Sequence, residues 1–184
     1  MAGLVCALAA CAQTPARPAV PSGLEPAWDI SALLLEMSGQ AARLLPALDQ
    51  VDAQAWVERG ASETYLAQLQ SSKDQARALS DGARALARNP EKLAATLELF
   101  LRIEGLETML RSLEEGIRKY QAPNLAGTIA GLAAAGGANR ERLRVYMVNL
   151  AAERDQQWEL MDREAQRCRA LLTQPSRRNP GRKQ

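Results

Sequence analysis

The stretch that decides the fold covers residues 90–120 and reads PEKLAATLELFLRIEGLETMLRSLEEGIRKY. Its apolar side chains recur at alternating spacings of four and three residues, which places them along one side of a long helix. They are Leu99, Ile103, Leu106, Leu110, Leu113, Ile117 and Tyr120. Acidic residues stand four positions before basic ones, as in Glu98–Arg102 and Glu114–Arg118, and this order stabilises a helix better than the reverse. We expect the rest of the chain to cover this stripe.

Three further stripes with the same spacing predict long helices over about residues 28–49, 63–88 and 140–173. The first consists of Ile30, Leu34, Met37, Ala41, Leu44, Leu48 and Val51, and the second of Tyr65, Leu69, Ser72, Ala76, Leu79, Ala83 and Leu86. The last consists of Met147, Ala151, Arg154, Trp158, Met161, Ala165, Cys168 and Leu172. Short helices are expected over residues 52–58 and 124–135. The predicted fold class is all-α, an elongated antiparallel bundle of four long helices and two short ones.

Helix boundaries follow from turn and capping residues. Pro46 is expected to kink the first helix or to start a new one, because it lacks an amide donor. Asp52 is expected to cap the first short helix, with Gly60 just past its end. The Asn89-Pro90 pair predicts an N-cap and a first helical residue for the helix over residues 90–120. Gly136-Gly137 is followed by Asn139, the expected cap of the last helix.

Composition supports the helical reading and limits the function. Hydrophobic residues make up 47% of the 184 residues and aromatic residues only 4%, so the apolar content is mostly Ala and Leu. The 23 basic and 21 acidic residues nearly balance, which argues against nucleic acid as a partner. No His is present, so the commonest metal ligand and general base are missing. We expect no cofactor, no metal and no enzymatic activity.

The first twelve residues, MAGLVCALAACA, are short, apolar and rich in small side chains, like the hydrophobic region of a secretory signal. Residues 8–11, Leu-Ala-Ala-Cys, resemble the lipobox of bacterial lipoproteins, in which the Cys is lipidated. That resemblance implies lipidation of Cys11 and, because Ala12 follows it, an outer-membrane anchor. Signal cleavage after Ala12 and no export are the alternatives. No basic residue precedes the apolar run, which a misplaced start codon would explain. We expect an exported protein, periplasmic or anchored to the outer membrane.

The remaining organisation is simple. Residues 13–26 contain four Pro residues and are expected to form a tether or a disordered N-terminus. The helical bundle domain is expected over residues 27–174. Residues 175–184 carry a basic tail that we expect to be disordered.

One face of the helix over residues 90–120 is a candidate docking site because its side chains are small. It consists of Gly105, Thr108, Ser112 and Gly116. A helix can approach closely at such a face. It packs either against the first or fourth helix of the chain itself, or against a second protomer or another partner.

Other candidates have plainer explanations. Cys168 lies on the last stripe and is expected to be a buried small hydrophobe, with no partner for an internal disulfide. Glu104 and Glu107 are expected on a solvated charged face and not at a metal site. Arg154 is the one charge on the last stripe, so it either sits at an opening of the bundle or is paired when buried.

Residues 89–120, together with GANRERLRVY at residues 137–146, resemble a group of uncharacterised exported all-helical proteins of acidobacterial type. That resemblance implies no activity and no site. The chain lacks the repeated Leu-Thr-x-x-Gln signature of periplasmic Spy-like helical chaperones.

These observations favour a non-enzymatic cell-envelope protein that acts through contacts with an unknown protein partner or with itself. The alternative is a periplasmic helical chaperone or stress sensor that binds apolar segments in a groove between helices. A chaperone would suppress the aggregation of a denatured client, whereas a scaffold would bind one defined partner.

Overall fold

A computed structural model describes residues 24–173 of the chain. The predicted leader with Cys11, most of the predicted tether and the predicted basic tail lie outside the described residues. Within the described part every regular element is an α-helix. None of these helices combines the length and the apolar content that crossing a membrane requires.

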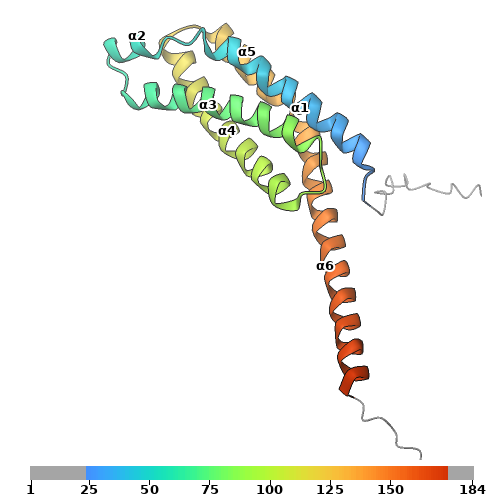
Figure 1. The fold of residues 1–184 in the computed structure, drawn as a ribbon. Coiled ribbons are helices and arrows are strands. Elements are labelled where there is room, and N and C mark those ends of the chain that lie inside the picture. The colour runs from blue at the N-terminus through green and yellow to red at the C-terminus, as the bar shows by residue number, and fades with distance from the viewer. Residues whose placement is uncertain (1–23, 174–184) are drawn as a thin grey trace, which may run out of the picture.

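Between Leu24 and Thr173 six helices follow one another (Figure 1). Four are long: α1 (Ala27–Leu48), α3 (Thr64–Leu86), α4 (Leu93–Tyr120) and α6 (Gly137–Thr173). Two are short: α2 (Ala53–Glu58) and α5 (Pro123–Ala134). Helices α1, α3 and α4 run back and forth, α5 packs on α4 and α1, and α6 packs mainly on α4. The predicted all-α bundle of four long helices and two short ones is confirmed.

The core lies between α1, α3 and α4, where the first three predicted stripes meet. Every residue of the α1 stripe, together with Val51 just beyond the helix, is buried. The α3 and α4 stripes are buried except at their aromatic ends, Tyr65 and Tyr120, which are partly buried. The alternation of four and three residues keeps these side chains on one side of each helix, so the three stripes can share one core.

Small side chains let α1 and α3 approach closely. Ala76 and Ala83 on α3 have no exposed surface, and α3 makes its most extensive contact with α1. Between the two helices the hydroxyl of Ser38 lies 3.1 Å from that of Ser80, and both residues are buried. This mutual hydrogen bond removes the cost of burying two polar groups without partners.

The predicted ends of α2 are confirmed. A side-chain oxygen of Asp52 accepts a hydrogen bond from the backbone N–H of Ala55 at 3.0 Å, which is the capping geometry expected. Gly60 follows the helix with φ of 90°, a left-handed conformation that glycine adopts at little cost. Trp56 on α2 has no exposed surface and anchors this short helix in the core.

The predicted start of α4 is wrong. The helix begins at Leu93, and Asn89 is not its N-cap. Pro90 is buried instead, and its carbonyl accepts hydrogen bonds from the hydroxyls of Tyr146 at 3.2 Å and Thr96 at 3.4 Å. These bonds hold residues 89–92 as a turn, so contacts distant in sequence override the local capping preference.

At Pro46 one of the two predicted alternatives is excluded, and the predicted start of the last helix is wrong. Helix α1 continues past Pro46 to Leu48, so no new helix starts at that proline. Pro46 lies in the last turn, where few backbone bonds depend on it. Helix α6 already begins at Gly137, so Asn139 lies inside its first turn and does not cap it.

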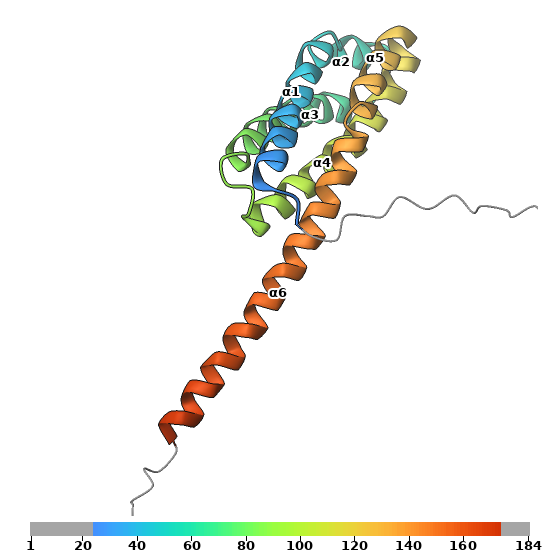
Figure 2. The same cartoon turned by 90° about the vertical axis from the view of Figure 1, so that its right-hand side faces the viewer.

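Helix α6 has 37 residues, a length of about 55 Å, and only its first part packs on the bundle. Its buried side chains are Leu143, Tyr146 and Leu150. From Arg154 to Thr173 every residue is exposed, and this part runs past the end of the bundle (Figure 2). We call residues 154–173 the α6 extension. Of the last predicted stripe, the part from Arg154 onward is exposed, because no other described helix reaches the second half of α6.

Candidate interaction surface

The α6 extension carries large apolar side chains in solvent. Trp158 is 73% exposed, Met161 65% and Leu172 86%. Single exposed apolar residues are common on protein surfaces, whereas a contiguous group of them marks a contact site. The extension is therefore the first candidate for a functional surface.

These side chains belong to a regular stripe. We call Trp158, Met161, Ala165, Cys168 and Leu172 the extension stripe, and their spacings alternate between three and four residues. On α4 the same spacing lies in the core, whereas all five residues of the extension stripe are exposed. Cys168 is thus exposed, and its predicted burial is wrong because the bundle ends before α6 reaches it.

The extension stripe continues the face by which α6 packs on the bundle. Met161 lies 18 residues after Leu143, and Cys168 lies 18 residues after Leu150. Eighteen residues make about five turns of helix, so each pair points to the same side. The bundle and the extension stripe therefore lie on the same side of α6, one beyond the other along its axis.

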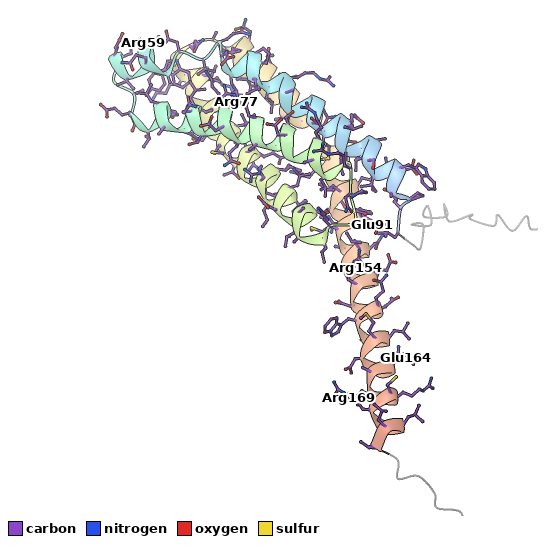
Figure 3. All side chains as sticks on the ribbon, in the orientation of Figure 1. Arg59, Arg77, Glu91, Arg154, Glu164 and Arg169 are labelled. Carbon is purple, nitrogen blue, oxygen red and sulfur yellow. The ribbon has the colours of Figure 1, made fainter. Side chains whose placement is uncertain are left out.

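Arg154 marks the point at which α6 leaves the bundle. Its guanidinium donates a hydrogen bond to the backbone carbonyl of Glu91 at 3.3 Å and lies 3.8 Å from the Glu91 carboxylate. A further hydrogen bond reaches the side-chain oxygen of Gln157 at 3.1 Å. Figure 3 shows Arg154 and Glu91 together below the bundle, with Glu164 and Arg169 farther along the extension. Of the two predicted places for Arg154, the structure gives the bundle edge, with an exposed ion pair.

Tyr146 ties the same turn to the packed part of α6. Its ring is buried, and its hydroxyl donates to the carbonyl of Pro90. Burial raises the pKa of the Tyr146 phenol above its ordinary value, and the nearby negative charges of Glu91 and Glu153 raise it further. Tyr146 and Arg154 together fasten the α3–α4 turn to α6.

Beyond Arg154, the polar contacts of the extension lie within the helix. Gln166 donates to Asp162 at 3.3 Å, and Arg167 lies 3.4 Å from Glu164. Such contacts between residues three or four apart are worth little in solvent. They leave the extension stripe exposed along its whole length.

The four residues of the predicted small-residue face lie in different surroundings. Gly105 is exposed, and a Cβ built there would meet no other atom within 4 Å. Thr108 and Ser112 lie near the surface; the first donates to the carbonyl of Glu104 at 2.9 Å and the second to the side-chain oxygen of Gln68 at 3.3 Å. Gly116 is buried. The four residues therefore form no single docking face.

An aromatic cluster at the end of the bundle explains Gly116. A Cβ at this position would come within 2.9 Å of the rings of Trp56 and Tyr65. Those rings meet edge to face at 5.5 Å, and Tyr120 stacks at 6.2 Å from Trp56. The side-chain oxygen of Gln121 accepts from the Trp56 indole at 3.2 Å. Helices α2 and α3, not the predicted first or fourth helix, thus cover this end of the face.

The paired carboxylates of α4 form ion pairs. Arg140 on α6 pairs with Glu107 and lies 3.5 Å from Glu104. This contact fastens α6 to α4. In the part of the chain that the structure describes, no group of three or more Cys, Asp or Glu side chains is placed to hold a metal ion.

The hollows between the helices differ in size. Open hollows of about 240 Å³ and 350 Å³ lie between α3 and α4 and between α4, α5 and α6. An apolar cavity of about 50 Å³ lies between α1, α3, α4 and α5 and is lined by Met37, Leu44, Leu79 and Leu106 among others. That volume holds only a few water molecules and is far below the size of a small-molecule site. All buried side-chain nitrogen and oxygen atoms within residues 24–173 have hydrogen-bond partners. This cavity is too small to serve as a groove for an apolar segment.

Comparison with known proteins adds no further assignment: no family model, curated protein or solved structure matches the chain. The candidate surface therefore rests on geometry alone. Sequence reasoning found the spacing of the extension stripe and missed its exposure. Helix length could have indicated this exposure, since α6 has 37 residues and the next longest described helix, α4, has 28.

Proposed function

We propose that this protein is a non-enzymatic cell-envelope scaffold that acts through protein–protein contacts made by the α6 extension. The observation that supports this most is the exposed extension stripe, in which Trp158, Met161 and Leu172 are each more than half exposed. Leaving such side chains in water costs about 1.5–3 kcal/mol each compared with burying them. A partner that covers them gains that free energy.

The bundle in this proposal is the support that holds the extension. Arg140 with Glu107, Tyr146 with Pro90 and Arg154 with Glu91 fasten α6 to α4 and to the turn before it. A binding element on a rigid scaffold loses less conformational entropy on binding than a free helix does. The arrangement is thus suited to presenting one helix face to another protein.

Export and lipid anchorage through Cys11 form the second part of the proposal. They rest on the leader residues 1–12 and on the lipobox resemblance of residues 8–11. An anchored protein would hold the bundle near a membrane surface and present the extension to other envelope proteins.

Photo-crosslinking in the native envelope tests the contact surface. A photoreactive residue replaces Trp158 in one variant and Trp28 on α1 in a matched control, because both tryptophans are 73% exposed. We expect protein adducts from position 158 and none from position 28. A lack of adducts from position 158 would contradict the proposal.

The chaperone alternative makes a different prediction. Purified protein in excess should suppress the aggregation of a denatured client if it binds apolar segments generally. We expect no suppression, because the extension stripe is one narrow line of side chains that suits a single partner helix. Suppression that is lost in Trp158→Ala would favour the chaperone over the scaffold.

A further inference from the structure

We infer that the extension stripe binds the α6 extension of a second copy of this chain, in antiparallel orientation. This inference rests on the proposed function and names the partner of the same surface. Three features of the extension support it: the side on which the bundle lies, the sizes of the stripe residues, and the distribution of charge along the helix.

The position of the bundle decides the orientation. Met161 and Cys168 point to the same side of α6 as the buried Leu143 and Leu150. A parallel partner would lie on that side and would bring its own bundle into the space that the first bundle occupies. An antiparallel partner carries its bundle at the opposite end, so both bundles stay clear of the paired helices.

The sizes of the stripe residues suit antiparallel packing. The longest overlap places Arg154 opposite Leu172 of the second copy. Trp158 then lies opposite Cys168, and Met161 lies opposite Ala165. Each large side chain meets a small one, which is how facing helices fill the space between them. A parallel pair would instead place Trp158 on Trp158 and Ala165 on Ala165.

Charge along the extension is complementary to itself in the same orientation. Residues 154–162 carry one Arg and three carboxylates, a net charge of −2. Residues 163–173 carry three Arg and one Glu, a net charge of +2. Antiparallel pairing sets the acidic half of each copy against the basic half of the other.

One pair of residues beside the extension stripe carries this complementarity most directly. At the overlap described above, Asp155 of one copy lies beside Arg169 of the other, and the two-fold symmetry repeats the pair. Near the centre Asp162 and Glu164 each meet their own copy, on opposite sides of the stripe, which opposes association. These repulsions offset the two Asp155–Arg169 pairs, so charge beside the stripe adds little to the strength of the dimer.

The interface is small. A tryptophan alone buries about 150–250 Å², and the stripe residues of both copies together reach about 1,200 Å², the lower end of specific interfaces. We therefore expect a dissociation constant in the micromolar range in solution.

Sedimentation equilibrium of the full chain, with Cys11→Ser to remove any lipid-driven association, tests the inference. We expect a monomer–dimer equilibrium whose dissociation constant rises at least about tenfold in Trp158→Ala. Trp28→Ala is the matched control and should leave the constant unchanged. A wild-type chain that stays monomeric throughout, or a dimer that Trp158→Ala does not weaken, overturns the inference.

A charge exchange tests the orientation. Arg169→Glu should weaken the dimer about tenfold, because it sets a second carboxylate beside Asp155 of the other copy. Adding Asp155→Arg to the same chain should restore the dimer. A parallel pair would place Arg169 beside Glu164 of the other copy, so Asp155→Arg could not restore that contact. Failure of the double variant to recover overturns the antiparallel arrangement.

The proposed function and this inference fail separately. A monomeric chain that still gives adducts with a different protein from position 158 removes the second copy as partner and leaves the scaffold. A chain that forms no adduct at all from position 158 removes both.

Discussion

Two glycines on α4 show how the same residue can have opposite roles on one helix. Gly105 faces solvent, and nothing lies within 4 Å of a Cβ placed there. Gly116 lies under the rings of Trp56 and Tyr65. Because glycine lowers helix stability, its presence at position 116 is explained by the aromatic cluster, whereas nothing in the structure explains it at position 105.

We predict that Gly105→Ala raises the free energy of unfolding by about 0.5–1 kcal/mol, since alanine favours the helix. Gly116→Ala should lower it by about 1–2 kcal/mol, because the new methyl displaces buried rings. Urea unfolding followed by circular dichroism gives both values. If Gly116→Ala is as stable as Gly105→Ala, the aromatic cluster does not cover this helix as described.

Tyr146 makes a prediction about alkaline pH. Its folded-state pKa is raised, mainly by burial, so the folded chain holds this proton more tightly than the unfolded chain. The stability that Tyr146 contributes is therefore complete below the unfolded pKa of about 10 and is lost as pH rises toward the folded value.

Tyr146→Phe should lower the free energy of unfolding by about 1 kcal/mol near neutral pH, because it removes the hydrogen bond to Pro90. The difference in free energy of unfolding between wild type and Tyr146→Phe should become smaller above about pH 10, because only the wild type has a buried phenol to ionise. Unfolding curves of both proteins at about pH 8 and pH 10.5 test this. A difference that stays constant would contradict it.

At the scale of the element, α6 is one continuous helix with a packed part and an exposed part. The first part is held by Leu143, Tyr146 and Leu150 in the core, whereas every residue of the extension is exposed. A helix of about 20 residues without packing is only marginally stable in water. The same element thus joins a stable segment to a weak one.

Hydrogen exchange should show this division. In dilute protein we expect the amides of residues 158–172 to exchange far faster than those of residues 99–117 in α4, whose apolar stripe is buried in the core. At high protein concentration the extension amides should slow down as dimers form, while α4 changes little. Equal protection of both segments in dilute protein would contradict the division.

At the scale of the whole molecule, the proposed lipid anchor at Cys11 predicts in which cell fraction the protein is found. We predict that wild-type protein fractionates with the outer membrane and that Cys11→Ser is soluble in the periplasm. Cys168→Ser is the control for losing a cysteine and should behave as wild type. If wild type and Cys11→Ser are both soluble in the periplasm, the lipoprotein prediction is wrong.

How far the sequence predicts the molecule depends on the range of the interaction. The stripes of α1, α3 and α4 were predictable because residue spacing alone decides which side of a helix is apolar. The start of α4 was not, since it depends on Tyr146, which lies 56 residues from Pro90 and reaches its carbonyl. Local capping preference carries no information about such a contact.

The candidate surface shows the same limit. The spacing from Trp158 to Leu172 is as regular as that from Leu99 to Ile117, yet one stripe is exposed and the other buried. What differs is where the neighbouring helices end, which no residue of α6 encodes. Likewise Gly105 and Gly116 are the same residue type on the same helix and differ only in whether other side chains pack against them.

The contact between Glu25 and Arg142 fixes where the N-terminal segment joins the bundle. The Arg142 guanidinium lies 2.9 Å from the Glu25 carboxylate, so a chain lipidated at Cys11 has about 13 residues with which to reach that point, a span of at most about 45 Å. Even fully extended, this segment is shorter than α6, which is about 55 Å long. Anchored copies would therefore meet in the thin layer beside the bilayer, where confinement raises their effective concentration. Copies that associate weakly in solution would then be mostly paired at the membrane.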